Sequence, residues 1–282
     1  MAQTILTLSK ALTVIDALAQ SHGPLGISEL SRRLGLSKNQ IFRVVKTLEQ
    51  FGYIQKADDK YALGLRFLEL GRHILNESDL VQTAIPHLNE VRNATGECVC
   101  LFMLDGRESV CIALREGLGL VNITARVGHR YLLHAGAAPK AILANQPAAF
   151  VQTVIDEHGL PAYTPHTITE RDELQRALAE IRERGFALSN EDMLIHAFEV
   201  AVPIYDRDDR VRAALSVTGP VDRFGPEERI AALRVIADVC DRISVSLGAQ
   251  VRPGPHVRTN LRFAMNEHDP ASIEAEATGE YR

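Results

Sequence analysis

The spacing of apolar residues predicts a helix near the start of the chain. Between Leu8 and Leu18, apolar residues recur every three or four positions, which places them on one face of a helix. Gly23 and Pro24 interrupt this pattern, because both residues disfavour a continuing helix. We therefore expect a first amphipathic helix that ends before this pair.

Two more helices follow, separated by a tight turn. Residues 28–34 have the pattern of a short helix with Ser28 as its cap, and Gly35 suits the left-handed position that commonly ends a helix. Ser37 is the expected cap of a longer helix over residues 38–50. The buried face of this longer helix is expected to hold four apolar residues, Ile41, Val44, Val45 and Leu48.

A small hairpin completes the N-terminal pattern. Short strands are expected at residues 53–55 and 61–63, on either side of a polar turn at residues 57–60. A helix, a turn, a second helix and a two-stranded wing together predict an all-α winged helix-turn-helix with a β-hairpin wing. Residues 65–76 are expected to form a helical linker.

The rest of the chain alternates between strand and helix patterns. Helices are expected at residues 79–95, 140–145, 148–158, 170–184 and 226–247, and strands at residues 97–104, 108–114, 120–127, 186–189, 198–205 and 210–218. This order favours an α+β domain with a mainly antiparallel sheet. The segment after Gln250 is rich in proline and has little periodicity, so we expect disorder. The predicted parts are the winged helix-turn-helix (1–64), a linker (65–78), the α+β domain (79–250) and a disordered tail (251–282).

Composition narrows the class of protein. The 282 residues are 46% hydrophobic and 24% charged, which is typical of a soluble globular protein. The sequence has no long apolar run and no signal-peptide pattern, so we expect no membrane partner. The four cysteines form no CxxC pair, which favours a reducing cytoplasm over a zinc or disulfide framework.

Charge is distributed unevenly along the chain. Residues 1–76 carry ten basic and six acidic side chains, a net charge of +4, whereas the whole chain carries −5. A basic N-terminal module on an acidic body is expected if only the N-terminal part binds the phosphate backbone of a nucleic acid.

The second helix of the pair offers side chains that can read bases. Asparagine and glutamine pair with adenine, and arginine and lysine with guanine, in the major groove. The candidate DNA-binding residues are Ser28, Ser37, Lys38, Asn39, Gln40 and Arg43, with Lys56 and Lys60 of the wing on phosphates. The alternative is a small helical subdomain whose polar residues only cap helices and face solvent.

Catalytic and metal-binding signatures are missing from the sequence. It contains no GxSxG, GxxxxGK[ST] or HExxH motif, so we expect no enzyme and no cofactor. His129 and His134 are the closest histidine pair that invites a metal interpretation, but no ligand spacing supports it.

Several segments, in order, resemble the IclR family of bacterial regulators across residues 7–248. They are residues 27–43, 47–53 and 61–64 in the N-terminal part, and residues 134–141 (HAGAAPKA), 201–206 (AVPIYD) and 214–220 (ALSVTGP) in the rest. The resemblance implies a homodimer or dimer of dimers that binds operator DNA. It also implies a GAF-like C-terminal domain that senses a small-molecule effector.

The resemblance also places an effector site. In that family, small metabolites, often carboxylates, lie between the sheet and the loop before the helix that corresponds to the one expected at residues 140–145. Helix N-termini bind anions through free N–H groups, although small residues there also permit tight packing. The candidate effector residues are Cys98, Ala137, Ala138, Lys140, Ser189, Glu199, Ser216 and Thr218.

This sequence departs from the family around that site. Pro139 replaces a glycine, Ser189 stands where an acid is frequent, His196 where glycine is common, and Glu199 where small or polar residues occur. A buried Glu199 would need a partner or a proton, and would favour a cationic or hydroxylated ligand. The alternative places Glu199 on the outer face of its strand.

The main hypothesis is therefore a ligand-responsive transcriptional regulator whose effector is an organic acid, an aromatic compound or a sugar derivative. The competing hypothesis is a metabolite-binding or enzymatic domain whose N-terminal module makes protein contacts. A third possibility is a repressor that responds to no effector.

Overall fold

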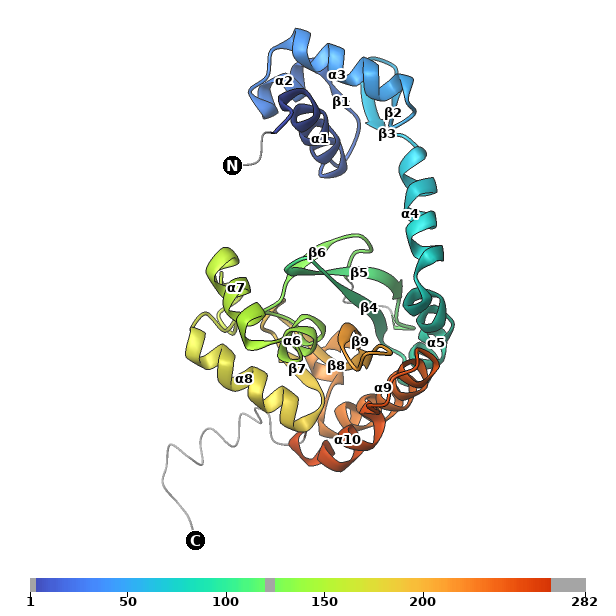
Figure 1. Ribbon diagram of the computed structural model, residues 1–282, viewed down its shortest axis with the longest axis vertical. Coiled ribbons are helices and arrows are strands. Elements are labelled where there is room, and N and C mark those ends of the chain that lie inside the picture. The colour runs from blue at the N-terminus through green and yellow to red at the C-terminus, as the bar shows by residue number, and fades with distance from the viewer. Residues whose placement is uncertain (1–3, 120–124, 265–282) are drawn as a thin grey trace. The chain divides into compact units, whose positions relative to one another are not determined.

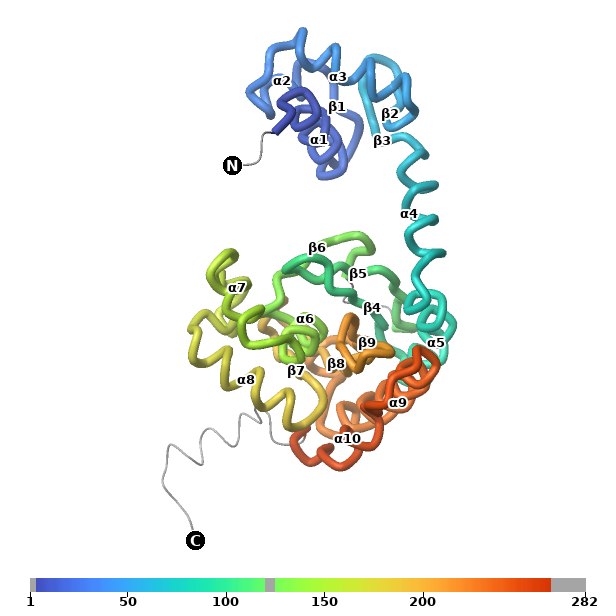
Figure 2. Tube along the Cα trace, in the orientation of Figure 1, coloured from blue at the N-terminus to red at the C-terminus, as the bar shows by residue number. Residues whose placement is uncertain are grey.

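The computed structural model describes residues 4–119 and 125–264. The chain divides into two compact units, residues 1–78 and 79–282, and the boundary falls where the predicted linker ends. Figures 1 and 2 trace both units. No helix in the described residues is long and apolar enough to cross a membrane.

The N-terminal unit is the predicted winged helix-turn-helix. Its elements are α1 (Leu6–Ala19), β1 (Leu25–Gly26), α2 (Ile27–Leu34), α3 (Lys38–Gln50), β2 (Ile54–Ala57), β3 (Lys60–Leu63) and α4 (Arg66–Glu77). All four residues expected on the inner face of α3 are buried, and they pack with Val14, Leu30 and Tyr61. The prediction missed β1, whose two residues pair with β3 to make a third strand. A strand of two residues is too short to show alternation.

The start of α2 corrects one predicted cap. The helix begins at Ile27, one residue before the predicted cap, so Ser28 lies within the first turn. The Gly26 N–H is instead satisfied by the Glu29 carboxylate, which accepts from it at 2.9 Å. Gly35 does end the helix in the left-handed conformation, with φ of 64°.

The C-terminal unit is an α+β domain built on one antiparallel sheet. Its strands are β4 (Cys98–Asp105), β5 (Glu108–Arg115), β6 (Arg130–Leu132), β7 (Ala187–Asn190), β8 (Ala197–Tyr205) and β9 (Val211–Pro220), in the order β6-β5-β4-β9-β8-β7. Its helices are α5 (Asp79–Thr95), α6 (Ala137–Ala144), α7 (Ala148–His158), α8 (Arg171–Arg184), α9 (Pro226–Ser246) and α10 (Pro253–Asn260), with short 3-10 turns at Val221–Arg223 and Leu261–Ala264. Helices cover both faces of the sheet (Figure 1).

Alternation along the strands produces two separate cores. In β9, Leu215 and Val217 face one side and pack with the core formed by α5 and α9. Ala214 faces the other side, where Cys100, Ala141 and Leu178 form the core beneath α6 and α8. Successive strand residues point to opposite faces, so a sheet covered on both faces needs apolar residues at both.

The prediction of a strand at residues 120–127 is only partly testable. Residues 120–124 lie outside the described residues, and residues 125–127 are not in a strand. The edge strand is instead β6, which pairs with Glu108–Val110 of β5. Only three residues long and partly exposed, β6 has no apolar repeat that the sequence pattern would reveal.

The prediction of a disordered tail is wrong for residues 253–264. There α10 packs against α9, and Val257 is fully buried in the sheet–helix core. The Arg252 guanidinium donates to the Asp241 carboxylate at 2.5 Å. A Cβ at Gly254 would lie 3.1 Å from the Asp241 Cβ, so glycine allows a closer approach of the two helices than a larger residue would. A helix anchored by one valine and one glycine shows no periodicity in sequence.

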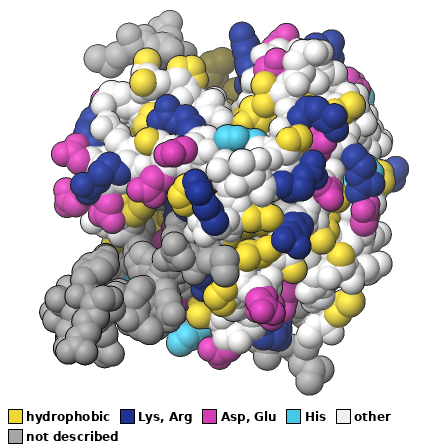
Figure 3. All heavy atoms as spheres, turned by 90° about the horizontal axis from the view of Figure 1, so that it is seen from below, with side chains coloured by type: hydrophobic (Ala, Val, Ile, Leu, Met, Phe, Trp, Pro, Cys, Tyr) yellow, Lys and Arg dark blue, Asp and Glu magenta, His cyan; other side chains and the backbone are white. Residues whose placement is uncertain are grey.

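Basic and acidic side chains are interspersed on the face drawn in Figure 3, with hydrophobic side chains between them. Mixed charge of this kind is typical of a solvated protein surface.

Replacing Val257 tests whether α10 contributes to stability. We expect Val257→Ala to lower the free energy of unfolding by about 1–3 kcal/mol, because it leaves a cavity in a packed core. The control is Val251→Ala, since Val251 is 41% exposed and its replacement should change stability by less than about 0.5 kcal/mol. Chemical denaturation of both variants measures the free energies of unfolding. Equally small changes in the two variants would mean that α10 does not contribute to stability.

Candidate functional site

The start of α3 is held by a reciprocal pair of hydrogen bonds. The Ser37 hydroxyl accepts from the Gln40 N–H at 3.3 Å, and the Gln40 side-chain oxygen accepts from the Ser37 N–H at 3.1 Å. This capping box satisfies two of the N–H groups that begin the helix. The predicted cap at Ser37 is confirmed, and the Gln40 side-chain oxygen is already engaged inside the protein.

Three other predicted base-reading residues remain free at this helix. Lys38, Asn39 and Arg43 are exposed, and their side chains make no hydrogen bond or ion pair with any described residue. Free donors at the N-terminal end of an exposed helix are what a major-groove reader presents.

The wing carries less net positive charge than its lysines suggest. Lys56 pairs with Asp59 at 3.1 Å across the hairpin, whereas Lys60 is exposed and forms no such pair among the described residues. Ser28 is also exposed, on the first turn of α2.

A cavity of about 250 Å³ lies in the C-terminal unit between the sheet and the start of α6. The predicted residues Ser189, Glu199 and Thr218 line it. The other lining residues are Cys100, Phe102, Ala125, Tyr131, Gly136, Pro139, Met193, Leu194 and Ala197. The predicted residues Cys98, Ala137, Ala138, Lys140 and Ser216 do not line it, although all are buried close to it.

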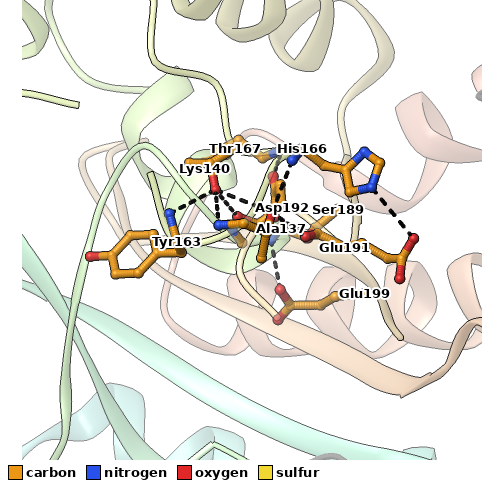
Figure 4. A network of polar contacts seen from close by, with 11 residues as sticks. Ala137, Lys140, Tyr163, His166, Thr167, Ser189, Glu191, Asp192 and Glu199 are labelled. Atoms are coloured by element: carbon orange, nitrogen blue, oxygen red, sulfur yellow. Dashed lines mark hydrogen bonds and ion pairs between the residues drawn. The ribbon is translucent and has the colours of Figure 1, made fainter. Parts of the chain in front are cut away.

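Two carboxyl groups hold the first N–H groups of α6 (Figure 4). The Gly136 N–H donates to Asp192 Oδ1 at 3.0 Å, and the Ala137 N–H donates to Glu199 Oε2 at 2.6 Å. Gly136 has φ of 84°, a left-handed conformation that glycine adopts without strain. Of the two sequence alternatives for Glu199, the inner face of the strand is therefore correct.

Lys140 does not face the cavity, in contrast to its predicted role. Its ammonium group pairs with the Asp192 carboxylate, and both side chains are less than a tenth exposed. Asp192 also accepts from the Ser189 hydroxyl. Lys140 therefore balances a buried acid of the protein instead of a ligand.

Asp192 is the functional residue that the sequence interpretation missed. Ser189 is the residue expected at this site, and the acid that accepts from the Gly136 N–H comes from a loop three residues further on. The Thr167 hydroxyl donates to the Asp192 carbonyl at 2.6 Å, which fixes the loop that carries Met193 and Leu194 into the cavity wall.

His196 ends this loop in a conformation that usually needs glycine. Its φ is 64°, and its N–H donates to Glu191 Oε1 at 2.6 Å. A non-glycine residue is uncommon there, and the hydrogen bond supports it.

Burial raises the pKa of Glu199, and neighbouring groups oppose the shift only in part. The Ser216 hydroxyl and the Ala137 N–H lower this pKa, Asp192 raises it and Lys140 lowers it. A carboxyl group packed between the sheet and the start of α6 is desolvated, which disfavours its charged form. Glu199 therefore holds its proton to a higher pH than an exposed glutamate.

Three buried thiols, those of Cys98, Cys100 and Cys111, lie close together beside the cavity. The Cys98 and Cys100 sulfur atoms are 3.7 Å apart, and only Cys100 reaches the cavity. The hydrogen bond between Cys100 and Cys111 raises the pKa of Cys100 and lowers that of Cys111. No group of His, Cys, Asp or Glu side chains in the described part of the chain has the arrangement of a metal site.

Both units match sequence profiles of one family. Residues 7–58 match the IclR helix-turn-helix domain, and residues 72–245 match the bacterial transcriptional regulator IclR C-terminal domain. The chain is 33% identical to the HTH-type transcriptional regulator XynR of Escherichia coli over 79% of its length and 90% of the relative. It is 30% identical to the HTH-type transcriptional repressor AllR of Klebsiella pneumoniae, over 86% and 89%.

Solved structures agree with the sequence matches. The Thermotoga maritima IclR structure superposes with a TM-score of 0.73 at 30% identity, covering 87% of this chain and all of that one. An IclR homologue from Microbacterium hydrocarbonoxydans, complexed with 4-hydroxybenzoate, superposes with a TM-score of 0.75 at 25% identity, covering 86% and 98%.

Removing one partner of the buried ion pair should destabilise the C-terminal unit. We expect Lys140→Met to cost about 3–5 kcal/mol, because it leaves Asp192 buried without its counter-charge. Adding Asp192→Asn should recover part of that loss, since the amide oxygen can still accept from Gly136 and Ser189. Thermal or chemical denaturation of the single and double variants measures the coupling, and additive losses would contradict the assignment.

Proposed function

The chain belongs to the IclR family of bacterial transcriptional regulators, and on this basis we propose that it reads operator DNA with the start of α3 and binds its effector in the cavity beside α6. It is a ligand-responsive DNA-binding regulator, as its relatives are. Those relatives are named as regulators and repressors, which argues against the alternative of an enzymatic domain with an N-terminal module for protein contacts.

The DNA contacts are assigned by which side chains are free. Arg43 and Lys38 have donors that suit guanine, and Asn39 suits adenine. Gln40 and Ser37 hold the helix start, so we assign them to positioning and to backbone contacts. Ser28, Lys56 and Lys60 lie exposed on α2 and the wing, where contacts to phosphates fix the register of the module.

The observation that carries the effector proposal is the cavity beside α6. Its volume of about 250 Å³ is below the range of about 300–1,000 Å³ that holds drug-sized ligands, so it suits a compact metabolite. Apolar side chains, among them Phe102, Met193 and Leu194, form most of its wall. The homologue complexed with 4-hydroxybenzoate supports an effector of about one ring.

Exposed apolar side chains support self-association through the N-terminal unit. Leu65, Leu68 and Ile74 of the α4 region are 78%, 64% and 69% exposed, and no residue of this helix is buried. A groove of about 860 Å³ lies along α4, with Gly52 on its wall. An isolated helix of 12 residues is marginal in water, so we propose that a second copy of the chain covers it.

Substitutions at α3 and the wing should separate base reading from phosphate contact. We expect Arg43→Ala to weaken binding to DNA from the protein's own promoter region by about 10–100-fold and to relax sequence preference. Lys60→Ala should weaken binding to all DNA sequences alike, and should reduce the slope of log affinity against log salt concentration by about 1. Lys46→Ala is the matched control, because Lys46 lies on α3 but pairs with Glu49.

Fluorescence anisotropy at several salt concentrations measures all three variants. Binding by the wild-type protein that is neither salt-sensitive nor sequence-selective would refute the DNA-reading assignment.

A charge on the outer face of α4 should disrupt the dimer. We expect the wild-type protein to elute with at least twice the 31.1 kDa mass of one chain, and Leu68→Glu to shift it toward the single-chain mass. Glu77→Ala, at an exposed position of the same helix that does not line the groove, should leave the mass unchanged. Light scattering after size exclusion gives the masses, and a monomeric wild-type protein would contradict the proposal.

A further inference from the structure

The anion-binding groups of α6 are already occupied by carboxyl groups of the protein itself. A helix N-terminus attracts an anionic ligand because its first N–H groups have no partner. Here the Gly136 N–H donates to Asp192 and the Ala137 N–H donates to Glu199 (Figure 4). A carboxylate ligand would have to displace Glu199 before it could use this end of the helix.

The charges around the cavity also disfavour an anion. Glu199 is the one carboxyl group among the described lining residues, and no lysine or arginine is among them. The nearest ammonium group, that of Lys140, is paired with Asp192 and does not reach the cavity. Nothing in the described wall therefore offers a positive charge to a ligand.

We propose that Glu199 is the specificity-determining residue of this cavity and selects an effector whose polar end donates hydrogen bonds, an amine or an alcohol, over a carboxylate. The compact apolar body of such a ligand would lie against Phe102, Tyr131 and Met193. This inference rests on the proposed function, because it assumes that the effector enters this cavity.

Glu199 has the geometry of a group that serves the ligand as well as the fold. One oxygen, Oε2, accepts from the Ala137 N–H at 2.6 Å, and the residue reaches the cavity surface. A hydrogen-bond donor of the ligand would replace part of the hydrogen bonding with water that this carboxyl group loses on burial. The neighbours of Glu199 that titrate or carry charge are Asp192, Lys140, Cys111 and Tyr131.

Three ligands of one shape test the proposal with the full-length protein. Benzylamine, benzyl alcohol and benzoate share a ring and differ only in their polar end. We expect benzylamine and benzyl alcohol to raise the melting temperature of the wild-type protein, and benzoate to bind about 10–100-fold more weakly than benzylamine.

Two substitutions at Glu199 should change the relative affinities of the three ligands. Glu199→Gln keeps an oxygen that accepts from the Ala137 N–H but removes the charge. Binding of benzylamine should therefore weaken, while binding of benzyl alcohol should be retained. Glu199→Ala frees the Ala137 N–H, so benzoate should gain at least tenfold. Glu227→Ala on the exposed first turn of α9 is the control and should behave as the wild type.

The dependence on pH gives a second readout, which a purely structural role would not produce. Because burial raises the pKa of Glu199, its charged fraction increases over a higher pH range than that of an exposed glutamate. Benzylamine binding should strengthen over that range in the wild type and not in Glu199→Gln, whereas benzyl alcohol binding should change little in either.

The outcomes distinguish the inference from the proposed function. Benzoate binding to the wild type as tightly as benzylamine, or no gain of benzoate in Glu199→Ala, would overturn the role of Glu199 alone. If none of the three ligands binds the wild type or Glu199→Ala while operator binding persists, the cavity is not the effector site, and both assignments fail.

Discussion

The N–H groups that begin a helix must find partners, and both candidate sites of this protein depend on how that requirement is met. At α3 the partners come from the same turn, Ser37 and Gln40. At α6 they come from Asp192 and Glu199, 56 and 62 residues away along the chain. The first arrangement leaves free the side chains that we propose contact DNA, and the second shapes the wall of the cavity.

At α3, the residues that cap the start of the helix differ from the residues whose side chains are free to contact DNA bases. Because Ser37 and Gln40 satisfy each other, Lys38, Asn39 and Arg43 are the side chains left free. The helix itself is fixed from below by Ile41, Val45 and the rest of a small core. A rigid helix with free donors at its start suits recognition that depends on position as well as on chemistry.

At α6, a buried ion pair determines where the cavity wall lies. Burying Lys140 and Asp192 is costly, and such a pair often contributes little net stability. Its consequence here is positional, because Asp192 joins the helix start to the loop that carries Met193 and Leu194. The same loop depends on the left-handed conformation of His196. The proposed specificity at Glu199 therefore depends on a loop that Lys140, 52 residues from Asp192 along the chain, holds in place.

The sequence by itself determined the family, the winged helix-turn-helix and most of the strands and helices of the second unit. These features depend on local spacing: apolar periodicity, the cap at Ser37, and Gly35 at a left-handed turn. Short or weakly patterned pieces escaped it, namely β1, β6 and α10, because two or three paired residues or a single buried valine leave no periodicity to read.

The tertiary structure alone decided the cavity. In the folded chain Lys140 points away from the cavity and pairs with Asp192. Glu199 lies on the inner face of its strand and accepts from the Ala137 N–H. Those outcomes depend on which residues meet after the sheet and α6 pack together, and contacts across some 60 residues carry no signature in the local sequence.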